Sequence, residues 1–448
     1  MASVSEQFLA NLSWKSWAQA KDLQKRILFM LGVLIVYRFG TYIPLPGINA
    51  TAMQALAQQY GGKGILAMFN MVSGGALERM SVFVLNLMPY ISASIIVQLM
   101  SAISPHFMAL KKEGDSGKRK LAQYTRYGTV ALASFQALAM SSALMLQPNV
   151  VFDPGLFFHL STLVTIVGAT LFLMWLGEQI TNRGIGNGSS MIIYAGIMAN
   201  LPRSIFKTLE LGRTGGVSSS QMLLTVGFAV AIIAFIVFME RAYRKVIVQY
   251  PKRQVGQRVY AGEQAYMPFK LNASGVLSPI FAATLLGFFK LLANWPFLKN
   301  VPVVSGLFSV LFSDQTPIGL LVQIMLIVFF AFFYTTIVFN PDETAENLRK
   351  NGAFIPGYRP GTMTRDYFIY LLNRLTVIGA GYIAFVVVMP ELMNIVFGLN
   401  FPFQGTSFLI SVSVSLELIS QVHSYIISHQ YKSLLRRSEP LKGANQNL

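Results

Sequence analysis

Ten long apolar segments dominate this sequence and limit what the chain can fold into. An α-helix needs roughly 20 mostly apolar residues to cross the hydrocarbon core of a bilayer. Because hydrophobic residues make up 54% of the chain and charged residues only 12%, we predict an all-α polytopic membrane protein rather than a soluble one. The predicted transmembrane spans are residues 26–44, 81–102, 122–146, 157–180, 190–211, 220–240, 274–294, 317–339, 369–390 and 407–428.

The distribution of basic residues predicts the orientation of these spans. An even number of spans places both termini on the same side of the membrane. That side then carries 27 of the 35 lysines and arginines, the other side carries seven, and Arg38 lies within the first span. Because short cytoplasmic loops are enriched in Lys and Arg, we expect both termini to be cytoplasmic.

The predicted spans divide into two halves of five, residues 26–211 and residues 220–428. Two polar segments, residues 1–25 and 429–448, flank these halves on the predicted cytoplasmic side. Two comparable halves are typical of transport proteins built from an internal repeat, but no repeat is visible in the residues themselves. The two-half architecture is therefore a hypothesis at this point.

The apolar stretch from Gly61 to Ser101 is interrupted in its first part. Residues 82–100 are long enough to span a membrane, whereas five glycines and the charged pair Glu78–Arg79 break the residues before them. Non-helical backbone at membrane depth is tolerated only where protein or a cavity surrounds it. Residues 64–79 are therefore either a re-entrant half-helix inside a protein-lined cavity or an external loop with an amphipathic helix on the membrane surface.

The cytoplasmic loop 340–374 carries the signals of a short helix. Asn340 can cap its first turn, and Pro341 suits the first helical position. Arg349 and Lys350 favour the last turn because of the helix dipole, and an Asn-Gly pair follows them. We predict a helix from about residue 341 to residue 350.

Arg359 follows this predicted helix, between two Pro-Gly pairs. Prolines stiffen a turn and direct the side chain between them outward, so either Arg359 is presented to a partner or it only binds lipid phosphate. A second loop, residues 240–271, carries seven basic residues interleaved with tyrosines. This composition suits RNA or lipid headgroups equally well.

The sequence contains no set of residues with the types and spacing that catalysis, metal binding or cofactor binding requires. The four histidines lack metal-ligand spacing, there is no cysteine, and the glycine-rich residues 184–188 follow a predicted helix rather than the strand that a nucleotide loop requires. Glu417 is the one acid well inside a predicted span. It could carry protons in an ion-coupled transporter, or it could bond to neighbouring Ser and Gln side chains.

Several long motifs resemble those of one family. They are YIPLPGI, NMVSGGAL, MPYISASIIVQL, KKEGDSGKRKLAQYTRYGT, FLMWLGEQITNRGIGNG and FNPDETAENLRKNGAFIPGYRPG. In this order they resemble the bacterial SecY family, the channel subunits of the Sec translocon, from about residue 25 to residue 431. The resemblance implies ten transmembrane helices in two pseudo-symmetric five-helix halves, arranged as a clamshell around an hourglass pore. It also implies that residues 64–79 form a re-entrant plug helix.

The resemblance assigns residues to the pore and its lateral gate. The implied pore ring consists of Leu87, Ile91, Ser189, Ile193, Ile280 and Ile410. Ser189 departs from the family's aliphatic side chain, which implies a looser seal there or compensation by Met191. The implied lateral gate includes Ser92, Asn187 and Phe288. The implied plug residues include Asn70, Ser73, Gly74 and Gly75.

Cytoplasmic docking residues are implied in the two loops. They are Arg258, Arg349, Lys350 and Arg359. Gln257 stands where many members of the family have a second arginine beside Arg258, so the contact through loop 240–271 is less firmly implied than the one through Arg359.

The resemblance implies a protein-conducting channel and not an enzyme. Such a channel moves unfolded preproteins across the bacterial plasma (inner) membrane and releases transmembrane segments laterally into the bilayer. The implied partners are SecE and SecG, the SecA ATPase, the ribosome with its rRNA and proteins, signal peptides, preproteins and anionic lipids, with no cofactor. The alternative is an ion-coupled solute transporter that uses Glu417 or Glu178.

Overall fold

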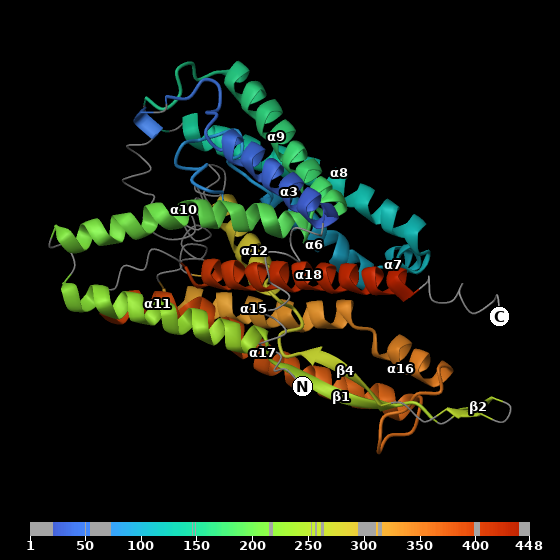
Figure 1. The fold of residues 1–448 in the computed structure, drawn as a ribbon. Coiled ribbons are helices and arrows are strands. Elements are labelled where there is room, and N and C mark those ends of the chain that lie inside the picture. Colours follow the sequence, from blue (N-terminus) through green and yellow to red (C-terminus); the bar gives the residue numbers. More distant parts are fainter. Residues whose placement is uncertain are drawn as a thin grey trace.

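The computed structural model is mostly helical (Figure 1). It describes residues 21–49, 51–53, 73–145, 147, 149–214, 218–251, 253–255, 258–260, 264–293, 311, 316–397 and 404–438. Ten helices coincide with the ten predicted spans: α3 (Lys21–Gly40), α6 (Met88–Ile103), α8 (Asp115–Met145), α9 (Leu156–Arg183), α10 (Gly188–Arg213), α11 (Ser219–Glu240), α12 (Leu277–Ala293), α15 (Pro317–Val338), α17 (Thr362–Phe397) and α18 (Gly405–Ser438).

Length and composition identify six or seven of these helices as membrane-spanning within the described ranges. The six are α8, α9, α11, α15, α17 and α18. A seventh is obtained if α6 and the short α7 (Pro105–Lys112), which meet at an angle of 97°, are counted as one broken span. The predicted helical membrane fold is thus confirmed, whereas α3, α10 and α12 match predicted spans by position without meeting the same criteria.

The first part of the predicted span 81–102 is not helical. Residues 82–87 form turns, and α6 begins only at Met88. Asn86 adopts a φ of +48° and Pro89 occupies the first turn of α6. A left-handed residue ends regular helix, and proline is tolerated only in the first turn because it lacks an N–H group. The predicted start was therefore several residues too early.

The described part of the predicted plug also lacks a helix. Residues 64–72 lie outside the described ranges, and residues 73–79 form turns. Gly74 and Gly75 have φ values of +70° and +82°, a conformation that favours glycine. The prediction of a half-helix over residues 64–79 is therefore wrong for residues 73–79.

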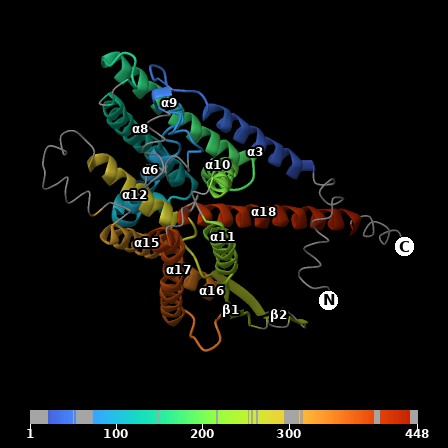
Figure 2. The same cartoon turned by 90° about the vertical axis from the view of Figure 1, so that its left-hand side faces the viewer.

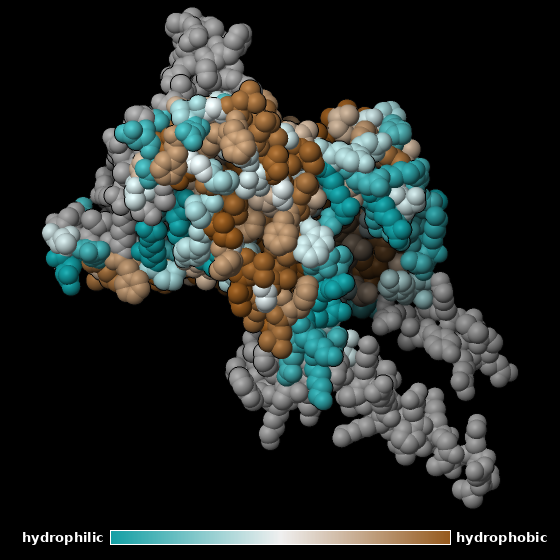
Figure 3. Space-filling model, turned by 90° about the horizontal axis from the view of Figure 1, so that it is seen from above, coloured by the Kyte–Doolittle hydropathy of each residue, from teal (hydrophilic) through white to brown (hydrophobic). Residues whose placement is uncertain are grey.

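The helices pack as two groups with α10 and α18 side by side between them. Helices α3, α6, α8 and α9 contact one another on one side, and α11, α12, α15 and α17 lie on the other (Figures 1 and 2). Contacts between α6 and α12 and between α10 and α18 join the groups. The face seen in Figure 3 carries a broad apolar area beside hydrophilic side chains, as expected of a surface that meets lipid.

The two loops predicted to be cytoplasmic, residues 240–271 and 340–374, fold together and have a small core of their own. Strand β1 (Tyr243–Gln249) pairs antiparallel with β4 (Gln264–Lys270), and β2 (Arg253–Val255) pairs with β3 (Arg258–Tyr260). Val246 and Val248 pack with residues of the second loop. The other buried members of this core are Phe269, Leu348, Ala353, Ile355, Phe368, Leu372 and Leu375.

The predicted helix of the second loop is confirmed as α16 (Pro341–Lys350). The Asn340 side chain accepts a hydrogen bond from the N–H of Glu343 at 3.5 Å. Gly352, with a φ of +70°, follows its end. The four strands were not predicted, although the three consecutive β-branched residues 246–248 favour a strand.

A close approach of α9 and α10 gives a test of this packing. A Cβ atom on Gly188 would overlap the carbonyl of Gly177, whereas one on Gly168 of α9 would meet no atom within 4 Å. Gly188→Ala should therefore lower the free energy of unfolding by about 1–3 kcal/mol, and Gly168→Ala should not lower it. Thermal unfolding of the detergent-solubilised protein measures both; an unchanged Tm for Gly188→Ala would contradict this packing.

Candidate functional site

Five of the six predicted pore-ring residues lie in one buried apolar cluster. Leu87 directly precedes α6 and Ile91 belongs to it, while Ile193, Ile280 and Ile410 come from α10, α12 and α18. Leu87 and Ile410 are only 1% exposed. The cluster is the main core of the bundle, with further members on α3, α9, α11, α15 and α17. Both helix groups contribute to it, and the five predicted ring residues within it offer no hydrogen-bonding side chain.

Ser189 is not part of this apolar cluster. It lies in the first turn of α10, where its Oγ donates to Oδ1 of Asn187 at 2.7 Å. Asn187 also accepts a hydrogen bond from the Ser189 N–H at 3.1 Å and so caps the helix. Met191, two residues further on, is buried and does belong to the cluster. Helix capping thus accounts for both polar side chains at this position.

The predicted gate helices α6 and α12 contact each other. Thr284 of α12 lies with its Oγ1 3.7 Å from the Sδ of Met88 on α6. Ser92 donates to the Met88 carbonyl at 3.0 Å within α6. The side chain of Phe288 is outside the described part of the structure, one helical turn beyond Thr284. Sequence reasoning missed Thr284 because no local pattern marks a contact between distant helices.

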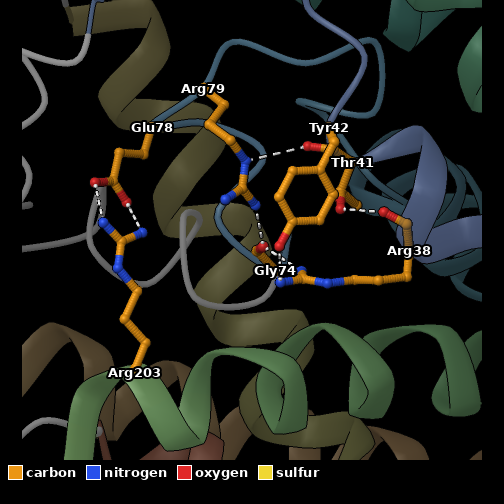
Figure 4. A network of polar contacts seen from close by, with 7 residues as sticks. All are labelled: Arg38, Thr41, Tyr42, Gly74, Glu78, Arg79 and Arg203. Atoms are coloured by element: carbon orange, nitrogen blue, oxygen red, sulfur yellow. Dashed lines mark hydrogen bonds and ion pairs between the residues drawn. The ribbon is translucent and has the colours of Figure 1, made fainter. Parts of the chain in front are cut away.

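The described plug residues are held by an arginine network (Figure 4). The Gly74 carbonyl accepts hydrogen bonds from Arg38 Nη1 at 2.7 Å and Arg79 Nη2 at 2.9 Å. Arg79 Nε also donates to the Thr41 carbonyl at 3.3 Å. Both guanidinium groups lie over the Tyr42 ring, 4.9 and 4.2 Å from its centroid. Charge-assisted bonds therefore satisfy a backbone carbonyl that no helix satisfies.

A second contact joins the same segment to α10. Arg203 Nη1 and Nη2 each lie 3.2 Å from a carboxylate oxygen of Glu78. Ser73 is buried beside these residues, whereas Asn70 lies outside the described ranges. Glu78, Arg79 and Arg38 are visible in the sequence as charges within or beside apolar segments. Arg203 carries no such signal, since nothing local pairs it with a residue 125 positions away.

The predicted docking residues lie on the two folded loops, 240–271 and 340–374. Arg349 and Lys350 contact Glu346 within α16, at 4.0 and 3.3 Å. The Arg359 side chain is exposed and forms no ion pair with any described residue. Its carbonyl accepts a hydrogen bond from Thr364 at 2.9 Å, which holds the turn. Arg258 lies in β3, and its side chain is not described.

Glu417 has a structural partner one turn along α18. Its Oε1 accepts a hydrogen bond from Nε2 of Gln421 at 3.3 Å. This contact matches the interpretation of Glu417 as a residue bonded to a neighbouring amide. Among the described residues, no group of three or more His, Asp or Glu side chains could hold a metal ion.

Solved structures show the same fold. A structure described as a protein conducting channel aligns with a TM-score of 0.66 at 16% identity, covering 91% of this chain and 93% of the other. A second concerns the plug domain of the SecY protein and aligns at 0.64. A third is Sec61 in the canine ribosome-channel complex from the endoplasmic reticulum, with a TM-score of 0.63 at 15% identity.

Sequence comparisons identify the family. A family model described as SecY matches residues 81–419. The protein translocase subunit SecY of Rickettsia bellii is 48% identical over 431 residues, which cover 95% of this chain and 98% of that protein. The subunit of Escherichia coli K12 is 45% identical over 432 residues, 94% of this chain and 96% of the other. The chain therefore belongs to the SecY family.

Proposed function

We propose that this chain is the channel subunit of a bacterial protein translocase. It passes unfolded preproteins across the plasma (inner) membrane and releases transmembrane segments sideways into the bilayer. The observation that carries this proposal is that the five aliphatic ring residues, contributed by α6 with the residue before it, α10, α12 and α18, lie together in the buried apolar core that both helix groups share. Membership of a family whose named relatives are protein translocase subunits supports the same function.

The five aliphatic ring residues act as the seal of the pore. A narrow constriction without polar side chains excludes water and ions by dewetting. The same side chains offer no hydrogen bond to a passing polypeptide, so any unfolded sequence can slide through. Leu87, Ile91, Ile193, Ile280 and Ile410 form this ring, and Met191 supplies the apolar surface that Ser189 lacks.

The contact between α6 and α12 is the lateral gate. Binding of a hydrophobic signal sequence between these helices buries leucines, each of which contributes about 1.5–3 kcal/mol. Changing a population from mostly closed to mostly open needs about 5.5 kcal/mol of differential binding. A few leucines are therefore sufficient to open the gate, whereas a polar segment is not.

The folded cytoplasmic loops dock the partner that supplies energy, since the sequence has no recognised nucleotide-binding motif. A SecA-type ATPase or the ribosome binds there through Arg359, with Arg258, Arg349 and Lys350 nearby, and SecE and SecG accompany the chain in the membrane. The ribosome-bound Sec61 relative supports a ribosome contact. Both termini are cytoplasmic, as the charge distribution predicts, and anionic lipids contact the basic loops.

Replacing a ring residue tests the seal. Ile193→Asn should increase ion or dye leak through reconstituted channels severalfold, because an amide side chain stabilises water in the constriction. Val230→Asn is the control, since Val230 is exposed on α11 rather than in the cluster. Vesicle efflux without preprotein measures the effect. Equal leak from the parent and Ile193→Asn would remove Ile193 from the ring.

Reversing the exposed loop charge tests docking. Vesicles containing the chain, its small membrane partners and the ATPase motor should protect an unfolded preprotein from protease when ATP is added. Arg359→Glu should reduce this protection by about tenfold or more through loss of an interface charge, whereas the exposed Lys118→Glu should not. Full transport by Arg359→Glu would remove Arg359 from the docking site, and no transport by the folded parent would contradict the channel assignment.

The alternative solute transporter makes a different prediction for Glu417. A carrier that moves protons through this carboxylate should lose its activity in Glu417→Gln. A protein channel should keep most of its preprotein transport, because the amide can still bond to Gln421. The same protease-protection assay decides between them, with proton-coupled solute uptake measured in parallel.

A further inference from the structure

The ion pair between Glu78 and Arg203 connects the described plug segment to a helix of the pore. Arg203 belongs to α10, the helix that also carries Ile193 of the ring. Ten residues of helix separate them, a distance of about 15 Å along its axis. The two guanidinium nitrogens face the two carboxylate oxygens in a bidentate arrangement, the geometry that makes Arg–carboxylate pairs directional.

One face of α10 carries the whole contact. A Cβ on Gly74 would lie 3.3 Å from the Cα of Gly196, and a Cβ on Gly75 would lie 3.4 Å from Oδ1 of Asn200. Positions 196, 200 and 203 share one helix face by their spacing. The turn at Gly74 and Gly75 therefore packs directly against α10. The Glu78–Arg203 ion pair extends this contact by one further turn of α10.

Charge balance makes Glu78 the critical member of the network in Figure 4. Arg38 and Arg79 converge on one carbonyl, and Arg203 adds a third positive charge nearby. Glu78 supplies the one carboxylate among the seven residues drawn. It is only 23% exposed in its side chain, against 64% for Arg203, so water screens its charge less well than that of its partner.

We propose that Glu78 and Arg203 are positioning residues that latch residues 73–79 onto α10 and so stabilise the closed channel. This inference rests on the proposed function. Arg38 holds the same turn from α3, on the other side of the Gly74 carbonyl. Movement of the turn away from α10 must break the bidentate pair. The pair therefore opposes opening of the channel.

Charge removal and charge exchange test the latch in channels reconstituted with their partners. Glu78→Gln and Arg203→Gln should each raise ion leak without preprotein roughly two- to fivefold, the range expected of an exposed or half-buried ion pair. The double variant Glu78→Arg/Arg203→Glu should return leak toward the parent value, because it keeps both the pair and the net charge. Arg213→Gln, in the last turn of the same helix, is the matched control and should leave leak unchanged.

Two results would overturn the latch. One is parent-level leak in both single variants, and the other is a double variant as leaky as the singles, which would indicate a general structural role for each side chain. ATP-dependent preprotein protection, measured on the same vesicles, separates this proposal from the function on which it rests. A parent that transports while the variants show no added leak disproves only the latch, whereas a parent that fails to transport disproves the channel.

Discussion

At membrane depth, a backbone carbonyl that lies outside a helix must accept its hydrogen bond from another group of the protein. The turns between Ser73 and Leu87 face this constraint, and two arginines meet it at Gly74. Placing charged groups there is costly unless each is bonded. Tyr42 and the Thr41 carbonyl bond these two arginines, and Glu78 pairs with Arg203 of α10. The contacts around the Gly74 carbonyl therefore join the end of α3, residues 73–79 and α10.

The proposed pore ring follows the opposite principle. Its five aliphatic residues come from α6 with the residue before it, α10, α12 and α18, and so from both helix groups. An apolar constriction needs no chemical selectivity and no reacting group, which suits a channel whose substrates share little besides an unfolded backbone. The proposed function thus depends on a ring that makes no specific hydrogen bonds, together with residues 73–79, which are held by several hydrogen bonds.

Loops 240–271 and 340–374 form a packed unit, which suits the proposed docking of a partner that supplies work. Their core around Phe368 is separate from the core of the helix bundle. Such a core holds β1, β4 and α16 together, so the turn that carries Arg359 is supported from below. A flexible loop would move under an applied force, whereas a packed unit can transmit that force to the helices to which it is joined.

The sequence by itself determined the features that depend on neighbouring residues. Apolar segments located the helices of the predicted spans, and cap residues located α16. The tertiary structure decided where distant segments meet. The start of α6 at Met88, the contact of Thr284 with Met88 and the pairing of Arg203 with Glu78 all belong to this second class.

Family resemblance supplied the pore-ring residues, but only the folded chain placed Ser189 in a helix cap and Met191 in the cluster. The physical reason is the same in each case. Local periodicity and capping govern helix formation. The packing of the whole bundle decides which helix faces meet, and so whether residues 125 positions apart form an ion pair and whether a side chain lies in a cap or in a core.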